Sequence, residues 1–187
     1  MLLQHIPNFI TLLRILLVPP ILWLILQERY GWALSLFLVA GISDGIDGFL
    51  AKRYGWTSWL GGILDPLADK LLLMGTVLVL AWTELLPYWL VALIIFRDLL
   101  IVGGALAYHF WFEPVEATPL LVSKLNTVLQ IVLVLAVICD RSLWMLPDPM
   151  LTALIATTAL STALSGAAYV WEWSRRAWRK GRRIDVS

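Results

Sequence analysis

Long apolar runs separated by short polar segments dominate the pattern of this sequence. Six apolar stretches each approach the roughly 20 residues that a membrane-spanning helix requires. They lie near residues 8–27, 32–53, 60–82, 88–110, 119–139 and 149–172. The segments between them are short, so neighbouring helices should pack antiparallel. The pattern predicts an all-α, polytopic membrane protein with six transmembrane helices in a single domain, residues 1–187, and a short interfacial helix before Pro7.

The composition supports a membrane protein and excludes an ordinary soluble domain. Of the 187 residues, 60% are hydrophobic and 14% are charged, whereas a soluble domain carries about 25% charged residues. The net charge of +1 is uninformative as a total. The basic residues near the end of the sequence are too few and too close to an apolar segment to indicate nucleic acid as a partner.

The distribution of charge predicts the orientation in the membrane. A basic cluster follows the last apolar stretch, and such clusters mark the cytoplasmic side and attract anionic lipid headgroups. Its members are Arg175, Arg176, Arg179, Lys180, Arg182 and Arg183. Six spans would place both termini in the cytoplasm. The first apolar run is too long for the core of a cleavable signal peptide, and no Arg/Ser-rich presequence precedes it, so we expect a bacterial inner (plasma) membrane.

Four aspartates interrupt two of the apolar stretches. Asp44 and Asp47 lie in the second stretch, and Asp65 and Asp69 lie in the third. One aspartate at the centre of a spanning helix costs about 2.5–3.5 kcal/mol, so these side chains should face a polar interior. Spacings of three and four residues place each pair on one helix face, and a short turn should make the two helices neighbours.

Two explanations of the four carboxylates are open at this point. Nearby basic residues, Lys52, Arg53 and Lys70, could neutralise them as structural ion pairs. Alternatively, the carboxylates converge, and like charges at short range stay ionised only if cations neutralise them. Carboxylate oxygens are hard ligands that suit Mg²⁺ or Mn²⁺. The spacing favours a carboxylate-bound metal site.

Small residues surround the aspartates, where missing side chains let helix backbones or a bulky ligand approach closely. They are Gly41, Gly48, Ala51, Gly61, Gly62 and Ala68. Packing between helices explains such residues in isolation. Beside four acids, room for a diphosphate is the favoured interpretation.

The segment from Asp44 to Asp69 resembles the signature of the CDP-alcohol phosphatidyltransferase family. That signature reads D-x-x-D-G-x-x-A-R, eight residues, then G-x-x-x-D-x-x-x-D, and every fixed position matches except the arginine, which is Lys52 here. Lysine is a point charge and arginine a planar fork, so this departure bears on which residue contacts the diphosphate. The opening I-P-N-F-I-T-L-L-R, residues 6–14, is similar to the start of phosphatidylglycerophosphate and cardiolipin synthases in the family.

The resemblance implies a metal-dependent enzyme that moves a phosphatidyl group from CDP-diacylglycerol to an alcohol. It implies that Asp44, Asp47 and Asp65 hold two ions of Mg²⁺ or Mn²⁺ together with the CDP diphosphate. Asp69 would also ligate metal and would act as the general base on the acceptor hydroxyl.

The resemblance also implies a binding site for the CDP-lipid. Gly48, Ala51 and Gly61 would line the nucleotide pocket, and Lys52 would take the place of the diphosphate-binding arginine. Asn8 and Thr11, polar residues in an apolar run, either contact the nucleotide or satisfy the end of a helix.

Two later segments bear on the acceptor. Arg97 and Asp98 lie in the middle of the fourth stretch, and Lys124 opens the fifth. Lys124 is placed to meet an acceptor phosphate, with Arg97 as a second acceptor-binding residue. A structural ion pair and snorkelling of the lysine at the interface are the respective alternatives.

These segments, R-D-L-L-I and S-K-L-N-T, are similar to cardiolipin synthases of the CDP-alcohol type. Phosphatidylglycerophosphate synthases typically carry R-E-x-x-x-x-x-L-R-E at the first of them. Phosphatidylglycerol is therefore the expected acceptor, giving cardiolipin and CMP, and glycerol 3-phosphate is the alternative.

Two other classes of function fit a membrane protein with buried acids. Prenyltransferases also bind diphosphates through Mg²⁺, but their acids come as D-D-x-x-D runs, which are absent here. A metal transporter would have less reason for glycine and alanine beside its carboxylates. The run of small residues from Ser161 to Ala168, together with the resemblance, favours a possible homodimer.

Overall fold

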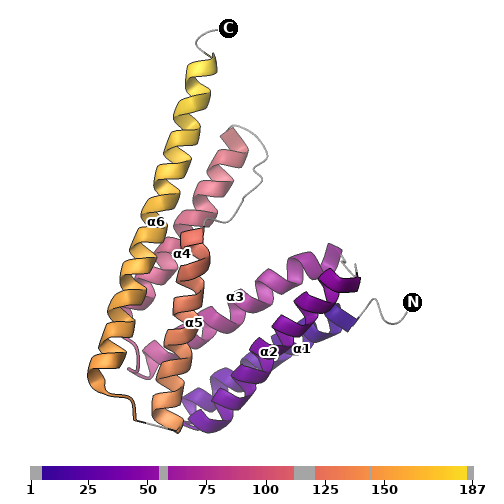
Figure 1. The fold of residues 1–187 in the computed structure, drawn as a ribbon, viewed down its shortest axis with the longest axis vertical. Coiled ribbons are helices and arrows are strands. Elements are labelled where there is room, and N and C mark those ends of the chain that lie inside the picture. The colour runs from indigo at the N-terminus through magenta and orange to yellow at the C-terminus, as the bar shows by residue number, and fades with distance from the viewer. Residues whose placement is uncertain (1–5, 55–58, 112–120, 144, 185–187) are drawn as a thin grey trace. The chain divides into compact units, whose positions relative to one another are not determined.

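The computed structural model is helical throughout the residues that it describes, which are 6–54, 59–111, 121–143 and 145–184. Side chains are described within these ranges except at 6–8, 47–52, 54, 59–63, 106–111 and 176–184. The elements are α1 (Ile6–Leu26), α2 (Tyr30–Tyr54), α3 (Trp59–Trp82), α4 (Tyr88–Trp111), α5 (Leu121–Ser142) and α6 (Asp148–Ile184) (Figure 1).

The helix bounds lie within a few residues of the predicted apolar stretches, with one exception. The last stretch was predicted to end at residue 172, whereas α6 continues through the basic cluster to Ile184. The predicted interfacial helix before Pro7 falls on residues 1–5, outside the described part of the chain.

Within the described residues, four helices are long and apolar enough to cross a membrane: α1, α4, α5 and α6. α2 and α3 have 25 and 24 residues, but both contain the charged residues of the aspartate signature, and the apolar part of α2 ends at Ile46. The prediction of an all-α, multi-pass membrane protein is confirmed to this extent.

The helices form two compact units. Unit 1 comprises Met1–Leu86 and Val134–Pro147, and unit 2 comprises Pro87–Leu133 and Asp148–Ser187. Unit 1 therefore holds α1, α2, α3 and the second half of α5, whereas unit 2 holds α4, the first half of α5, and α6.

In unit 1, α1 packs against both α2 and α3. Its buried stripe includes Val18, Ile21 and Ile25, whose spacing of three and four residues keeps them on one helix face. α1 and α3 both end in a tight turn, at Glu28 and Glu84, whose φ angles of 57° and 60° are left-handed. In each turn the next amide bonds to a carbonyl five residues back, which closes the helix end.

In unit 2, α4 packs against α6. The buried hydrophobic residues of α4 include Leu90 and Ile94. The described part of α6, in contrast, buries only small or hydroxyl-bearing residues: Thr158, Thr162, Ser165 and Gly166. The interior of unit 2 is therefore polar along α6.

Candidate functional site

The buried face of α1 changes from apolar to polar toward its N-terminal end. The stripe of Ile25, Ile21 and Val18 continues, with the same spacing, to Arg14 and Thr11. Arg14 is 1% exposed and Thr11 is fully buried. An arginine at such a position must meet acceptor groups, because a buried charge without partners is very costly.

Arg14 meets carboxylates from two other helices. Its Nη1 lies 2.6 Å from Oδ1 of Asp44 on α2 and 2.6 Å from Oδ1 of Asp69 on α3. One guanidinium nitrogen on α1 thus joins the two halves of the aspartate signature.

The third described carboxylate is also held by α1. The hydroxyl of Thr11 donates a hydrogen bond to Oδ1 of Asp65. Of the two interpretations of Thr11, satisfying a helix end and contacting a nucleotide, neither predicted this bond to the signature itself.

The aspartates have a buried side and an open side. The side chain of Arg14 has no exposed surface, whereas the side chains of Asp44 and Asp69 are 43% and 54% exposed. The carboxylates therefore remain accessible to a ligand while α1 holds them from behind.

Open space also lies beside Asp44 on α2. Among the described side chains and backbone, a Cβ atom added at Gly41 or Gly45 would meet no other group within 4 Å. Gly41 was predicted to leave room for a ligand. The absence of neighbours at both glycines is consistent with that prediction.

The structure describes only part of the predicted site. Asp44, Asp65 and Asp69 are tied to α1, but within the described residues no group of three acidic, histidine or cysteine side chains is gathered closely enough to hold a metal ion. The remaining predicted residues lie in α1, α2 and α3 with side chains outside the described part: Asn8, Asp47, Gly48, Ala51, Lys52 and Gly61.

Arg14 contacts the aspartates, yet the sequence pattern predicted no role for it. It is the last residue of the segment 6–14 that is similar to known synthases. The signal that points to it is its own chemistry: an arginine inside an apolar run, three residues after a polar threonine, needs acidic partners. The partners themselves are 30 and 55 residues away in the sequence, so no local spacing identifies them.

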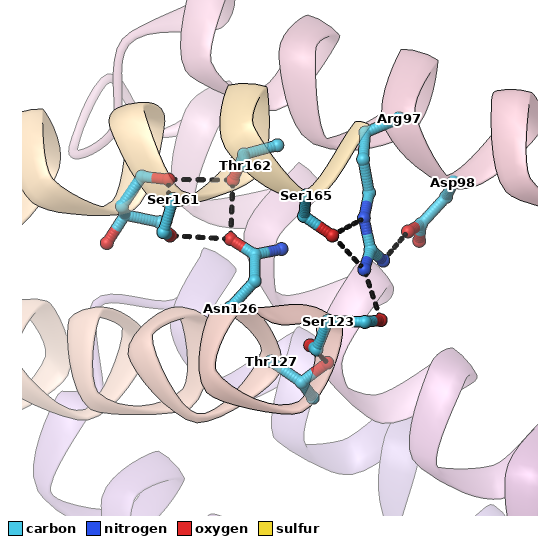
Figure 2. A network of polar contacts seen from close by, with 9 residues as sticks. Arg97, Asp98, Ser123, Asn126, Thr127, Ser161, Thr162 and Ser165 are labelled. Carbon is cyan, nitrogen blue, oxygen red and sulfur yellow. Dashed lines mark hydrogen bonds and ion pairs between the residues drawn. The ribbon is translucent and has the colours of Figure 1, made fainter. Parts of the chain in front are cut away.

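A second polar centre lies in unit 2 around Arg97, which is 7% exposed. Its Nη1 donates to Oδ1 of Asp98 at 2.8 Å, and its Nε and Nη2 donate to the hydroxyl of Ser165 at 3.1 and 2.7 Å. Nη2 also donates to the hydroxyl of Ser123 on α5 (Figure 2). A guanidinium has five N–H groups, so within the described residues Arg97 has one left, on Nη1.

The polar contacts continue between α5 and α6. Asn126 Oδ1 accepts hydrogen bonds from the hydroxyls of Ser161 at 2.7 Å and Thr162 at 2.9 Å (Figure 2). Asn126 bonds to Thr162, and Ser123 and Ser165 both accept from Nη2 of Arg97, so residue numbers rise along α5 as they fall along α6.

Gln130 and Thr158 lie one turn beyond Asn126 and Thr162 on their respective helices. Both are buried, and Gln130 Nε2 and Thr158 Oγ1 have no hydrogen-bond partner within the described part of the chain, nor has Asn126 Nδ2. The buried polar residues of α5 and α6 thus extend beyond the contacts of Arg97.

Lys124, the other predicted acceptor-binding residue, is exposed on the first turns of α5. It directly follows Ser123, which binds Arg97. Arg97 on α4 thus contacts the start of α5, where Lys124 also lies. Arg97 is buried, whereas Lys124 is exposed.

The sequence matches a known family over nearly its whole length. The model of the CDP-alcohol phosphatidyltransferase family matches residues 4–170. The chain belongs to the CDP-alcohol phosphatidyltransferase family, as the aspartate signature predicted. Members of this family are generally dependent on a divalent metal.

Relatives in the family have two kinds of names. A protein of Drosophila melanogaster named "Probable cardiolipin synthase (CMP-forming)" is 34% identical over 182 residues, 88% of this chain and 56% of that protein. The cardiolipin synthase (CMP-forming) of Streptomyces coelicolor is 40% identical over 117 residues, 58% of this chain and 54% of its own length. The chain thus spans little more than half of these two relatives.

The alignment with a third relative covers almost the whole length of both proteins. The CDP-diacylglycerol–glycerol-3-phosphate 3-phosphatidyltransferase of Bacillus subtilis is 31% identical over 195 residues, 93% of this chain and 95% of the relative.

Proposed function

We propose that this protein transfers the phosphatidyl group of CDP-diacylglycerol to phosphatidylglycerol, giving cardiolipin and CMP. Family membership supports the transfer reaction, and the names of the Drosophila and Streptomyces relatives support the acceptor. The structural observation that carries the proposal is the meeting of Asp44 and Asp69, from two helices, at one nitrogen of Arg14.

The donor set fits Mg²⁺ or Mn²⁺, of which we propose two ions. Carboxylate oxygens are the ligands that these ions prefer, and Oδ1 of Asp44 and Oδ1 of Asp69 already share one cationic neighbour. Asp44, Asp47, Asp65 and Asp69 would hold the ions. When bound, the metal would polarise the phosphoryl group and offset the charge of the leaving CMP.

The chain's own residues would bind the donor and move a proton. Asp69, half exposed at the open side of the site, would accept the proton of the acceptor hydroxyl as its oxygen bonds to the lipid phosphorus and the bond from that phosphorus to CMP breaks. The remaining signature residues and the α1 segment would hold the nucleotide and diphosphate. They are Gly48, Ala51, Lys52, Gly61, Asn8 and Thr11.

The phosphate of phosphatidylglycerol would be bound chiefly by Lys124. Its ammonium is exposed, whereas four of the five N–H groups of Arg97 are engaged by Asp98, Ser123 and Ser165. Arg97 would offer its remaining N–H and keep the start of α5 in place.

Glycerol 3-phosphate is the second candidate acceptor. The Bacillus relative, whose name specifies this acceptor, is covered over 95% of its length. The same carboxylates would perform the same transfer, and only the acceptor-binding residues would serve a different molecule.

We further propose that α2 and α3 also cross the membrane, which gives six spans with both termini in the bacterial cytoplasm. Their lengths of 25 and 24 residues are sufficient. The family match extends over both units, which supports one catalytic domain. A homodimer stays a proposal with a smaller basis, because Ser161, Thr162 and Ser165 of the small-residue run bind α4 and α5 of the same chain.

Lipid analysis of the purified protein tests this function. The protein, in detergent with Mg²⁺, receives CDP-diacylglycerol with either phosphatidylglycerol or glycerol 3-phosphate, and lipid products and CMP are measured. We expect cardiolipin and CMP from phosphatidylglycerol. Faster reaction with glycerol 3-phosphate would replace the acceptor, and no CMP release with either would exclude the transfer reaction, as for a prenyltransferase or a transporter.

A further inference from the structure

Arg14 and a divalent ion at the signature would use the same oxygens. Oδ1 of Asp44 and Oδ1 of Asp69 each lie 2.6 Å from Nη1 of Arg14. Because both oxygens contact the same nitrogen, an ion bound by them would have the guanidinium as its immediate neighbour.

The position of Arg14 makes it a fixed part of this site. It continues the buried stripe of α1, its side chain has no exposed surface, and a guanidinium stays protonated in proteins. Burial keeps the side chain from moving into solvent when another cation arrives. The positive charge behind the carboxylates is therefore permanent.

From this geometry we propose that Arg14 is the resident counter-cation of the carboxylate site, which joins α2 to α3 and lowers the affinity for the divalent ion. The inference rests on the proposed metal site. Arg14 then has two linked effects. Its attraction to the carboxylates holds α2 and α3 together, and repulsion between the guanidinium and the divalent ion weakens metal binding.

The two effects are linked because interactions at the same oxygens are coupled. If the guanidinium weakens the binding of the ion by some factor, the ion must weaken the guanidinium contact by the same factor. Removing the charge of Arg14 should therefore tighten metal binding while it loosens the metal-free protein. A residue that only fills space would change stability without tightening metal binding.

The test is the affinity of the purified full-length protein for Mn²⁺, measured by calorimetry and by the EPR signal of the free ion, with thermal unfolding in EDTA and in Mn²⁺. For Arg14→Gln we expect Mn²⁺ to bind roughly tenfold more tightly, within the usual range of such couplings. We also expect a lower midpoint in EDTA and a larger upward shift on adding Mn²⁺. Arg14→Lys, with a charge but without the fork, should fall between.

The matched control is Arg97→Gln, which removes another buried arginine whose bonds go to Ser123, Ser165 and Asp98. It should leave the Mn²⁺ affinity unchanged. An unchanged or weaker affinity in Arg14→Gln would overturn the inference, whereas absence of Mn²⁺ binding in the unmutated protein would remove the metal site itself.

The folding of the variants is also decisive. If Arg14→Gln folds only with Mn²⁺ present, the counter-cation role is supported. If it folds under neither condition, Arg14→Lys decides: tighter Mn²⁺ binding than in the unmutated protein supports the inference, and weaker binding overturns it.

Discussion

Within the residues whose side chains are described, each of the two units buries one arginine, and the two arginines have different kinds of partners. Arg14 in unit 1 binds two aspartates and lies one turn from Thr11, which binds a third. Arg97 in unit 2 binds one aspartate and two serine hydroxyls. Among these contacts, aspartates outnumber the arginine at Arg14, whereas one aspartate matches Arg97.

From this difference we expect the unit 1 site to bind further cations and the contacts of Arg97 to need none. Like charges in excess remain ionised only when additional cations approach, so the unit 1 site should bind metal. The charge of Arg97 is matched by one carboxylate and three of its other N–H groups bind serine hydroxyls, so we expect its contacts to act mainly as a structural junction of α4, α5 and α6. Each of the following changes tests one side of this comparison.

Removal of divalent metal should have the largest effect, because it acts on the site with excess negative charge. CMP release should stop in EDTA and return when Mg²⁺ or Mn²⁺ is added in excess. A stability variant in unit 2, such as Ser165→Ala, should lower the thermal stability by the same amount with and without the chelator. Full turnover in metal-free buffer would contradict the contrast between the units.

Asp69→Asn tests the proposed base within the unit 1 site. A neutral amide cannot accept the proton, and losing a general base costs about 10²-fold or more. We expect kcat to fall by that amount while CDP-diacylglycerol still binds. Asp140→Asn is the control, since Asp140 receives an amide hydrogen bond from Leu146 that asparagine can also accept. Retention of more than about a tenth of the rate in Asp69→Asn would assign the base to another residue.

Lys124→Ala tests whether unit 2 also binds the acceptor, in addition to forming the contacts of Arg97 with Asp98, Ser123 and Ser165. A charge-assisted hydrogen bond contributes about 1.5–3 kcal/mol, so kcat/KM for phosphatidylglycerol should fall roughly tenfold to a hundredfold. KM for CDP-diacylglycerol should stay nearly unchanged, and Lys124→Arg should keep most of the activity. Equal losses for both substrates would mean that Lys124 serves the donor or the fold.

The sequence was most informative about helices and least informative about contacts between them. Apolar runs predicted all six helices. The predicted end of the last one was too early because it followed hydropathy, whereas α6 continues through residues such as Ala177, Arg179 and Lys180, which favour helices.

Spacing identified the aspartates because each pair lies within one helix. It could not identify Arg14 as their partner, since Arg14 and Asp69 are separated by 55 residues. For the same reason Ser161 to Ala168 suggested packing between two chains, whereas Ser161, Thr162 and Ser165 bind α5 and Arg97. A run of small residues shows that a helix face is close to something, but not to what.

Ser165→Ala measures how much the contacts of Arg97 in unit 2 contribute to the free energy of unfolding. Ser165 accepts two hydrogen bonds from Arg97, and its loss would leave Nε and one Nη2 hydrogen without their acceptor. We expect the free energy of unfolding to fall by about 1–2 kcal/mol, as measured by denaturation in detergent. Ser35→Ala is the control, because Ser35 is exposed and bonds only to the carbonyl of Gly31 on its own helix. Equal effects of the two changes would show that the junction adds no stability.

Gly41→Ala has the smallest expected effect and addresses the open side of the unit 1 site. A Cβ at Gly41 would meet nothing within 4 Å in the part of the chain that the structure describes. Alanine is favoured over glycine inside a helix by up to about 1 kcal/mol, so stability should be unchanged or slightly higher. If the CDP-lipid occupies that space, one added carbon would overpack it at a cost of about 1 kcal/mol, which would raise KM for CDP-diacylglycerol roughly fivefold. Gly31→Ala, on the same helix and equally unobstructed, should change neither quantity. An unchanged KM in Gly41→Ala would place the donor on another face of α2, and the open face beside Asp44 would then belong to lipid or to the acceptor.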